Sequence, residues 1–314
     1  MQEAPLVAAP LTAYPNLGLV CITIGDEVRY RTITRKRLLQ FSEPEQQEIL
    51  RELYQSNIER LYGALQFCIT QKIHLYRFPT HLFPFADTPL GAAVLGEFSD
   101  LLLQAGQRAT QSGIRLLVHP EQFIVLSSES PQVVANSMMV LESQAWLMEL
   151  LGQPRSPWAL IEIHGGKRGR SEALTQVIGE LSDAVRSRLG LENDEYSYSA
   201  YEILEVCRTT GVAMIFDAHH HILKEGLDSY DHPSVAEMVQ AAQLTWPDPS
   251  WQVVHLSNGR THFRDRSHSD LIAEMPAAYA TVPWIEVEAK HKEAAIGQLR
   301  TTWGGNLVPT LEES

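Results

Sequence analysis

Histidines and carboxylates follow short apolar segments at intervals along this chain of 314 residues. The eight that we single out are His119, His164, Glu192, Asp217, His220, His255, His268 and Glu288. Imidazole nitrogen and carboxylate oxygen, without thiolate, favour Zn²⁺ or Mn²⁺ over iron–sulfur clusters or Cu(I). A carboxylate such as Glu192 can bridge two ions, and a bridged pair suits hydrolysis of a phosphoryl or acyl bond. Because eight ligands exceed what one ion needs, the set predicts two or three divalent ions.

The apolar segments are short runs rich in β-branched residues, each followed by a segment of helical period. The eight runs lie at 17–23, 73–78, 114–119, 159–164, 188–192, 212–218, 251–257 and 283–288. The expected helices include 43–68, 89–106, 131–152, 171–186, 199–210, 232–244, 269–280 and 289–300. Strand followed by helix, repeated eight times over this length, predicts an α/β fold, a (β/α)8 TIM barrel. Since no linker or composition shift divides the chain, we expect one domain over 1–314.

In such a barrel, functional side chains gather at the carboxyl ends of the strands. Alternation along 212–218 places Asp217 on one face with Ala213 and Ile215, pointing into the barrel mouth. A single histidine at a strand end is more often a hydrogen-bonded core residue than a ligand. Five imidazoles and three carboxylates that converge on one mouth have no such structural explanation, because buried unpaired carboxylates are costly. Four further histidines stay undecided: His81, His219, His221 and His262.

Composition and charge limit the class of protein. Hydrophobic residues make up 44% of the chain and charged residues 20%, as in a folded soluble protein. No apolar run approaches the ~18 residues of a membrane span, and residues 1–15 do not resemble a secretory signal. Three widely spaced cysteines suit a reducing cytoplasm. The net charge of −13 opposes binding to nucleic acid, although bound cations would offset part of it.

Nine segments, in their order along the chain, resemble the motifs of the UV damage endonucleases. They are LGLVCIT (17–23), YRFPTHLFPF (76–85), HPEQF (119–123), IEIHGGK (161–167), LENDE (191–195), FDAHHH (216–221), HLSNG (255–259), HSDLI (268–272) and EAKHKE (288–293). That family, related in barrel and metal site to the endonuclease IV group, has a (β/α)8 fold and up to three divalent metals, typically Mn²⁺. The resemblance implies a DNA repair enzyme that nicks the backbone immediately 5′ to a UV photoproduct. The products carry a 3′-hydroxyl and a 5′-phosphate.

The resemblance also assigns roles to matching residues. It divides the ligands among three ions: Glu192, Asp217, His255 and Glu288 at one, His119 and His164 with Glu192 at a second, and His220 and His268 at a third. Gln122 and Phe123 stand where the family has a glutamine–tyrosine pair that probes the damaged helix. An aromatic plane inserted there would detect a weakened base stack, because unstacking costs least at damaged bases.

Four positions depart from the family's usual pattern. Leu19 replaces a tyrosine near the lesion, and Thr23 replaces an asparagine. Val253 stands where some members carry a lysine that can be carboxylated, and Thr88 stands where a histidine is common. The departures leave all eight expected ligands in place. They therefore bear on the range of lesions and on the rate more than on the class of reaction.

Basic segments offer contacts for the phosphates of double-stranded DNA. They lie in loops that follow the first, fourth and seventh predicted strands, on the catalytic side of the barrel. The cations that we expect to contact DNA are Arg31, Arg35, Lys36, Arg37, Arg168, Arg260 and Arg264. A duplex laid across the mouth would meet all three loops. This local positive rim would counter the negative charge of the whole chain.

These observations predict hydrolysis of a phosphodiester by metal-activated hydroxide, with Glu192 at the centre and either Lys167 or Lys290 assisting the phosphate. The resemblance implies cyclobutane dimers, 6-4 photoproducts and abasic sites as targets. Zn²⁺ or Mg²⁺ could replace Mn²⁺. We expect a cytoplasmic, nucleoid-associated monomer with no membrane contact and no obligate protein partner.

Two alternatives remain open at this point. Barrels with Glu, Asp and His ligands also serve sugar isomerases and epimerases, which need two ions and a narrow pocket. The basic run RYRTITRKR (29–37) argues against that alternative. A catalytically silent DNA-damage-binding protein that keeps its metals for stability is the second alternative, and the complete ligand set argues against it.

Overall fold

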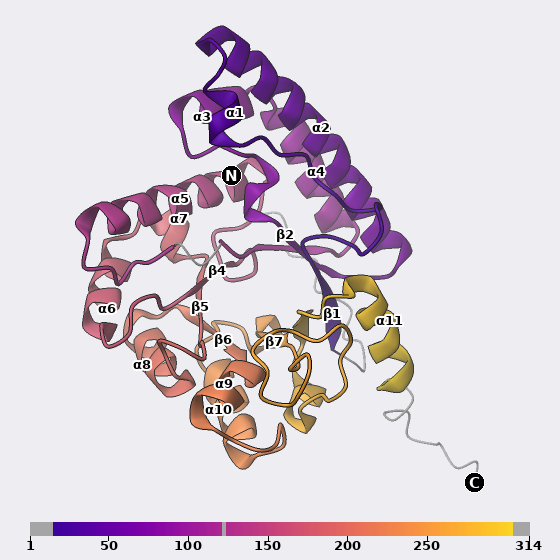
Figure 1. Ribbon diagram of the computed structural model, residues 1–314, viewed down its shortest axis with the longest axis vertical. Helices are drawn as coiled ribbons and strands as arrows, with labels where there is room; N and C mark the ends of the chain where they lie inside the picture. Colours follow the sequence, from indigo (N-terminus) through magenta and orange to yellow (C-terminus); the bar gives the residue numbers. More distant parts are fainter. Residues whose placement is uncertain (1–14, 121–123, 304–314) are drawn as a thin grey trace.

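Eight parallel strands pair in chain order, and the last pairs with the first, which closes a barrel (Figure 1). The computed structural model describes residues 15–120 and 124–303. The strands are β1 (Asn16–Val20), β2 (Leu75–Phe78), β3 (Arg115–Val118), β4 (Ile161–His164), β5 (Leu189–Glu192), β6 (Ala213–Asp217), β7 (Val253–Leu256) and β8 (Trp284–Val287). A strand overlaps each of the eight predicted runs. The predicted (β/α)8 barrel is therefore confirmed.

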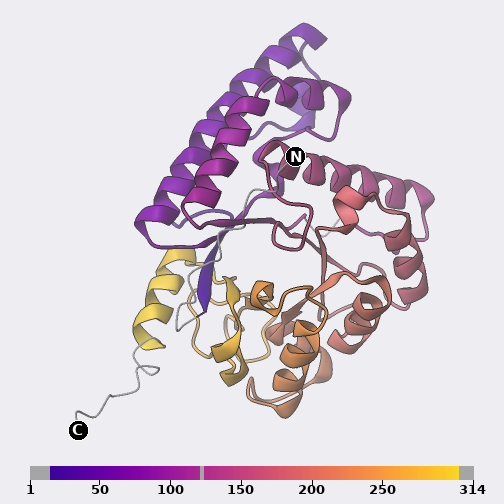
Figure 2. The ribbon, with the colours of Figure 1, turned by 180° about the vertical axis from the view of Figure 1, so that it is seen from behind.

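Helices surround the barrel, and α2 and α4 extend side by side beyond the others, with α1 and α3 near their outer end (Figures 1 and 2). The α-helices are α1 (Arg35–Leu38), α2 (Glu43–Thr70), α3 (Pro89–Gly96), α4 (Ser99–Gln111), α5 (Pro131–Leu150), α6 (Ser171–Glu180), α7 (Asp183–Arg186), α8 (Ala200–Thr210), α9 (Ala218–Glu225), α10 (Pro233–Gln243) and α11 (Lys292–Thr302). The 3-10 helices are η1 (Thr80–Leu82), η2 (Pro249–Trp251) and η3 (Ala277–Thr281). Within the described ranges, no helix combines the length and the apolar character needed to cross a membrane.

Local sequence explains where several helices begin. Before α2, the Glu45 carboxylate accepts a hydrogen bond from the Ser42 N–H at 2.8 Å. Before α8, the Glu202 carboxylate accepts from the Ser199 N–H at 2.8 Å, and the Ser199 hydroxyl accepts from the Glu202 N–H at 3.2 Å. These capping boxes satisfy amides that the first helical turn leaves unpaired.

The predicted helix at 269–280 is wrong. Most of this segment is irregular, and only its end belongs to a helix, the short η3. Pro276 lacks a backbone N–H and disfavours helical geometry at the preceding residue. The Asn258 side chain instead accepts hydrogen bonds from the backbone of Ala273 at 2.8 Å and of Glu274 at 2.9 Å. These bonds tie the long loop between β7 and β8 to the end of β7.

Two other helix predictions need correction, and one helix was missed. The predicted helix 89–106 is two helices, α3 and α4, and 171–186 is α6 and α7, divided where Leu181 is extended and Ser182 caps α7. The helix α9 was not predicted. It begins directly after β6, because the Asp217 carboxylate accepts a hydrogen bond from the His220 N–H at 2.8 Å. It ends at Glu225, before Gly226, which is left-handed with φ of 67°.

The strands separate two apolar clusters. Outward side chains such as Met214 and Phe216 pack among the helices in the larger cluster, whereas Ala213 and Ile215 lie in a smaller cluster inside the barrel. The alternation expected along β6 is therefore confirmed. The other buried members of the inner cluster are Leu75, Leu117, Leu160, Trp246, Val253 and Trp284. This apolar filling closes the amino-terminal end of the barrel and leaves polar chemistry to the carboxyl end.

Candidate metal centre

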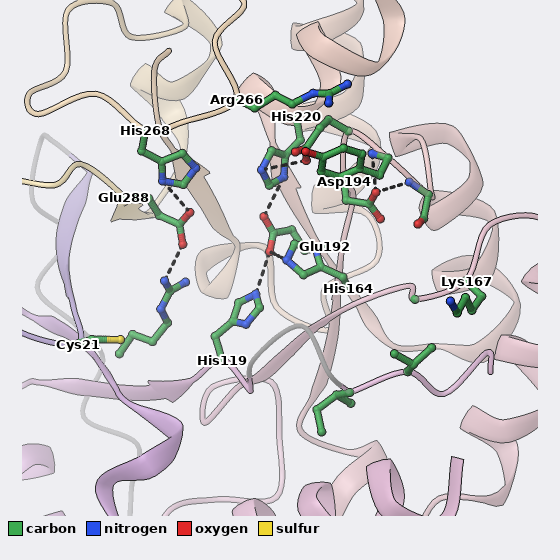
Figure 3. A pocket seen from close by; sticks show the side chains of 17 residues that line it. Cys21, His119, His164, Lys167, Glu192, Asp194, His220, Arg266, His268 and Glu288 are labelled. Carbon is green, nitrogen blue, oxygen red and sulfur yellow. Dashed lines mark hydrogen bonds and ion pairs between the residues drawn. The ribbon is translucent and has the colours of Figure 1, made fainter. Parts of the chain in front are cut away.

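The carboxyl ends of six strands carry the side chains that the sequence singled out. His119 directly follows β3, His164 ends β4, and Glu192 ends β5. Asp217 ends β6, and the immediate start of α9 places His220 beside it. The remaining three are His255 within β7, His268 in the loop between β7 and β8, and Glu288 after β8. Because parallel strands end at one rim, residues far apart in the sequence meet there (Figure 3).

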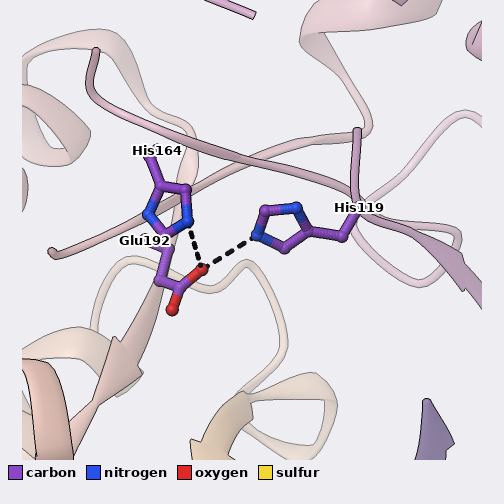
Figure 4. A group of neighbouring side chains, drawn as sticks. All are labelled: His119, His164 and Glu192. Carbon is purple, nitrogen blue, oxygen red and sulfur yellow. Dashed lines mark hydrogen bonds and ion pairs between the residues drawn. The ribbon is translucent and has the colours of Figure 1, made fainter. Parts of the chain in front are cut away.

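His119 and His164 meet the same oxygen of Glu192 (Figure 4). The Oε2 atom of Glu192 lies 2.9 Å from Nε2 of His119 and 3.6 Å from Nε2 of His164. The Nδ1 atom of His119 lies 3.0 Å from the Pro120 carbonyl, which can only accept a hydrogen bond. Nδ1 therefore donates to this carbonyl, which fixes the ring and presents Nε2 of His119 to Glu192. Metal-binding histidines are commonly oriented by such a backbone partner.

The other oxygen of Glu192 faces two more imidazoles. Its Oε1 atom lies 3.0 Å from Nδ1 of His255 and 3.3 Å from Nδ1 of His220. Nδ1 of His220 also donates a hydrogen bond to the Asn193 carbonyl at 3.0 Å. Nε2 of His220 is left facing Glu195, whose Oε2 atom is 3.6 Å away. Glu192 thus lies between four imidazoles, with two facing each of its carboxylate oxygens.

Glu288 lies on the β8 side of the same group. Its Oε1 atom is 3.7 Å from Nδ1 of His255, and its Oε2 atom is 3.8 Å from Nδ1 of His268. Potential ligand atoms of Asp217, His255 and Glu288 lie within 4.8 Å of one another. The same holds for His119, His164 and Glu192, and for Glu192, Asp217 and His220. His268, with ring centroid 6.4 Å from that of His220, lies at the edge of the cluster.

Buried polar atoms in this cluster lack hydrogen bonds. Within the described part of the chain, Oδ2 of Asp217 and Nδ1 of His164 have no hydrogen-bond partner. An unpaired buried polar group is costly, so these atoms call for a bound partner. The donors are imidazole nitrogens and carboxylate oxygens, which suit divalent cations such as Mn²⁺ or Zn²⁺. The residues therefore fit a cluster of divalent metals.

Charge interactions within the cluster are strong because it is buried. Burial by itself would raise the pKa of Glu192, but His255, His164, His119 and His220 hold that pKa well below its ordinary value. Burial would likewise lower the pKa of His255, but Glu192 and Glu288 raise it well above its ordinary value. Protons on the imidazoles and divalent cations thus compete for the same carboxylates.

A second acidic layer lies deeper in the barrel. Glu162 and Glu286 are fully buried and lie 3.4 Å and 3.2 Å from Nε2 of His255. One guanidinium nitrogen of Arg77 lies 2.5 Å from Glu286 and 3.5 Å from Glu162, and the other lies 2.6 Å from Glu288. The cationic partner of this layer is therefore a protein side chain. Sequence reasoning missed Arg77, although alternation along β2 places it on the inward face with Leu75.

A cavity of about 770 Å³ opens above the cluster. Lys167, Arg266 and Tyr196 line it together with six of the eight expected ligands. Lys290 is exposed and does not line it. Gln122 and Phe123 lie outside the described residues. Burial also lowers the pKa of Lys292, a residue that the sequence reasoning did not select, with Cys21 and Glu288 opposing the shift.

The seven basic residues expected to contact DNA do not line this cavity. Arg31 precedes α1, which carries Arg35, Lys36 and Arg37 near the outer end of α2 (Figure 1). Arg168 and Arg260 are exposed in the loops after β4 and β7. Arg264 donates hydrogen bonds to the carbonyls of Gly226 at 2.9 Å and Leu227 at 3.2 Å. Arg264 therefore has a structural role, because it holds its loop against the end of α9.

Two of the undecided histidines have structural partners. His219 contacts the Tyr230 hydroxyl at 2.7 Å and the Asp265 carbonyl at 2.8 Å, so both its ring nitrogens are used. His221 is fully buried and lies 2.9 Å from the Ser234 hydroxyl. His81 in η1 and His262 in the loop after β7 are exposed.

The positions that depart from the family's usual pattern have local roles. Leu19 and Val253 are fully buried in apolar clusters. Thr23 accepts a hydrogen bond from the Val28 N–H at 3.1 Å. Thr88 caps α3 by accepting from the Gly91 N–H at 3.1 Å. Each substituted side chain is thus accommodated without disturbing the cluster around Glu192.

Comparison with known proteins agrees with this geometry. A family model described as UV-endonuclease UvdE matches residues 15–306. The chain belongs to the UvdE family of endonucleases. A UV DNA damage endonuclease from Nostoc sp. is 52% identical over 293 residues, which cover 93% of this chain and 91% of that protein. Another from Deinococcus radiodurans is 51% identical over 291 residues, which cover 92% and 95%.

Solved structures support the shared fold. The crystal structure of SacUVDE matches with a TM-score of 0.81 and 23% identity, and covers 94% of this chain and 100% of that one. Endonuclease IV from Thermus thermophilus matches with a TM-score of 0.59 and 13% identity, over 93% and 100%. The resemblance drawn from the ordered motifs is confirmed, and UvdE membership decides against the sugar isomerase alternative.

Proposed function

We propose that this UvdE-family chain nicks double-stranded DNA immediately 5′ to UV photoproducts. Cyclobutane dimers and 6-4 photoproducts are the proposed substrates, with abasic sites as a further one. The reaction is hydrolysis: a water oxygen forms a bond to phosphorus, and the bond from phosphorus to the 3′-oxygen breaks. The 3′-oxygen leaves as a hydroxyl after gaining a proton, and the other product end keeps the phosphate.

The observation that carries this proposal is the position of Glu192 between four imidazoles, two on each carboxylate oxygen. We propose that His119 and His164 hold one ion with Glu192, that Asp217, His255 and Glu288 hold another with Glu192, and that His220 and His268 hold a third. Mn²⁺ is the proposed metal, with Zn²⁺ or Mg²⁺ as substitutes. When bound, such ions lower the pKa of water toward ~7 and neutralise charge on the reacting phosphate.

The protein's own cations would position the phosphate. Lys167 lines the cavity, so we propose that it contacts a phosphate oxygen next to the scissile bond. Lys290 is the weaker candidate for this task, because it is exposed outside the cavity lining. The cavity wall also holds Asp194 and Glu195, so it is acidic without metals and would repel DNA.

The flanking duplex would meet cations farther from the break. We propose that Arg168 and Arg260 contact phosphates near the cavity, and that Arg31 and the three cations of α1 contact the duplex beyond it. Arg264 would contribute to this surface mainly by holding its loop. Such contacts would orient the duplex without reading its sequence. Gln122 and Phe123 remain the proposed probe of the damaged stack. We further propose that the protein has a single domain, is a monomer, and associates with the nucleoid in the cytoplasm.

A plasmid nicking assay tests the function. Supercoiled plasmid, irradiated or not, is incubated with the protein and MnCl₂, and relaxation is measured. We expect relaxation of irradiated plasmid only, and at least a ~100-fold lower rate for Glu192→Gln, as for loss of a charge-stabilising group. The matched control is Glu205→Gln, the same change at an exposed position on α8.

The outcomes of this assay test the proposed function and the role of Glu192 separately. No relaxation of irradiated plasmid by the unaltered protein would refute the proposed function and favour a silent binder of damaged DNA. An undiminished rate for Glu192→Gln would refute the bridging role of that carboxylate. Metal content by elemental analysis of both proteins tests the ligand set separately.

A further inference from the structure

Tyr196 is an exposed aromatic residue on the wall of the cavity. Its relative exposure is 57%, although its neighbours Asp194 and Tyr198 in the loop after β5 are buried. Within the described ranges, its hydroxyl has no hydrogen-bond partner. The structure therefore provides no hydrogen-bonding reason for a tyrosine hydroxyl at this position.

The loop holds Tyr196 in a defined place. The Asp194 carboxylate accepts hydrogen bonds from the backbone N–H groups of Tyr196, at 2.7 Å, and of Ser197 and Tyr198. Lys224 of α9 donates to the Tyr196 carbonyl at 3.0 Å. A side chain on such a fixed backbone loses little further freedom when a ligand binds it.

Arg266 lies over the Tyr196 ring, with its guanidinium carbon 4.5 Å from the ring centroid. Its own loop, after β7, is also held: the Ser267 N–H donates to Asp265 at 2.9 Å, and the Arg260 N–H donates to the Ser267 carbonyl at 2.8 Å. The pair thus joins two separately fixed loops above the metal cluster. Figure 3 shows Arg266 on the same side of the cavity as His220 and Asp194.

The pair lies next to the position where the scissile phosphate would bind. Glu195, adjacent to Tyr196, is 3.6 Å from Nε2 of His220. An aromatic ring beside a guanidinium presents a flat apolar face together with a positive charge. Nucleobases stack on such faces whatever their sequence, while the cation attracts the backbone.

We propose that Tyr196 and Arg266 form a stacking platform for a base that leaves the duplex beside the lesion. This inference rests on the proposed function and adds a determinant of selectivity to it. UV photoproducts weaken the stack locally, so the platform gains a base more readily from damaged than from intact DNA. The platform therefore increases discrimination between the two substrates.

Nicking kinetics on a short duplex with one photoproduct test the platform. Tyr196→Ala should lower kcat/KM about 5- to 100-fold, mostly through KM, as for loss of one stacked base. Tyr196→Phe should stay within about twofold, because the ring is kept. The matched control is Tyr201→Ala, since Tyr201 is 47% exposed on α8 but does not line the cavity.

A second measurement separates stacking from structural damage. 2-Aminopurine placed beside the lesion changes its fluorescence when it leaves the duplex stack, and stopped-flow mixing records this change before nicking. The change should occur with the unaltered protein and Tyr196→Phe and be lost with Tyr196→Ala, at equal thermal stability and metal content. Arg266→Gln should reduce it partially.

The outcomes distinguish the platform from the function on which it rests. If the unaltered protein nicks the duplex and Tyr196→Ala does so within twofold of its kcat/KM, the platform is refuted and the proposed function stands. If the unaltered protein leaves the photoproduct duplex intact, the proposed function fails and the platform fails with it.

Discussion

The two ends of the barrel interior each bury an arginine, in opposite surroundings. Arg115, at the amino-terminal end, donates hydrogen bonds to the carbonyls of Pro157, Trp158 and Trp251 at 2.7–2.8 Å. Its guanidinium also lies over tryptophan rings, 4.9 Å from the ring centroid of Trp158. Arg77, nearer the carboxyl end, instead contacts three carboxylates, those of Glu162, Glu286 and Glu288.

The surroundings change the electrostatics of the two cations. Burial lowers the pKa of Arg115 to about 9, although Glu162 and Glu286 oppose the shift. Burial acts on Arg77 too, but Glu286 and Glu288 hold its pKa well above the ordinary value. We call the amino-terminal end of the barrel the lower end and the carboxyl end the upper end. At the lower end Arg115 is paired with carbonyl groups, whereas the upper end presents nitrogen and oxygen atoms that need cations. In barrel enzymes the amino-terminal end serves stability and the carboxyl end carries the reaction.

Removing the lower arginine should have the largest effect on stability. Arg115→Met leaves three partly buried carbonyls unpaired, at about 1–3 kcal/mol each, so we expect the free energy of unfolding to fall by about 3–6 kcal/mol. Urea denaturation measures this, with exposed Arg108→Met on α4 as the control. Metal bound per folded molecule should not change. A loss below about 1 kcal/mol would contradict the view that the amino-terminal end of the barrel serves stability.

Removing the upper arginine should give a loss that metal partly reverses. Arg77→Met leaves buried carboxylates without their cation, and we expect about 3–5 kcal/mol of stability to be lost in metal-free protein. Mn²⁺ should restore more stability to this variant than to the unaltered protein, because it replaces lost positive charge near Glu288. Denaturation with EDTA or MnCl₂ measures the difference. Equal stabilisation by Mn²⁺ in Arg77→Met and Arg115→Met would contradict this expected difference.

Metal should stabilise the protein through the upper end alone. At a free concentration 100 times the dissociation constant, Mn²⁺ should add about 2.7 kcal/mol to the free energy of unfolding. His119→Ala should weaken this effect, whereas His74→Gln, at a half-buried position remote from the cluster, should not. Thermal unfolding across a Mn²⁺ titration checks both variants. A His119→Ala titration that overlays that of the unaltered protein would remove His119 from the ligand set.

The smallest effect concerns the thiols of the outer core. Burial raises the pKa of Cys68 to about 12 and also raises that of Cys207, whereas Cys21 is half-buried at the cavity. Buried protonated thiols stabilise the fold fully below their unfolded pKa of 9.0, and this contribution falls as the pH rises from 9.0 toward 12. At pH 10 we expect about 1 kcal/mol lost per thiol.

The pH dependence of unfolding in Cys68→Ala and in the unaltered protein checks the thiol effect. The fall above pH 9 should be smaller in the variant. Parallel curves would show that Cys68 contributes nothing to it. At pH 7, a thiol reagent should modify Cys68 and Cys207 only on unfolding.

Much of the fold and the candidate site followed from local patterns. Apolar runs ending in His164, Glu192 and Asp217 predicted three strand ends and the residues at the barrel mouth, because a strand's period of two decides which side chains point inward. The same reasoning failed at 269–280, where helical period was outweighed by Pro276 and by backbone hydrogen bonds donated to a distant side chain, Asn258.

The chain by itself determined the alternation of strands and helices, the strand-end chemistry and the family, since each is written in neighbouring residues or in ordered motifs. Only the closed barrel decided that Arg77 meets Glu286 and Glu288, and that Arg266 lies over Tyr196. The physical reason is distance along the chain: no local period says which inward side chains face each other once β8 pairs with β1.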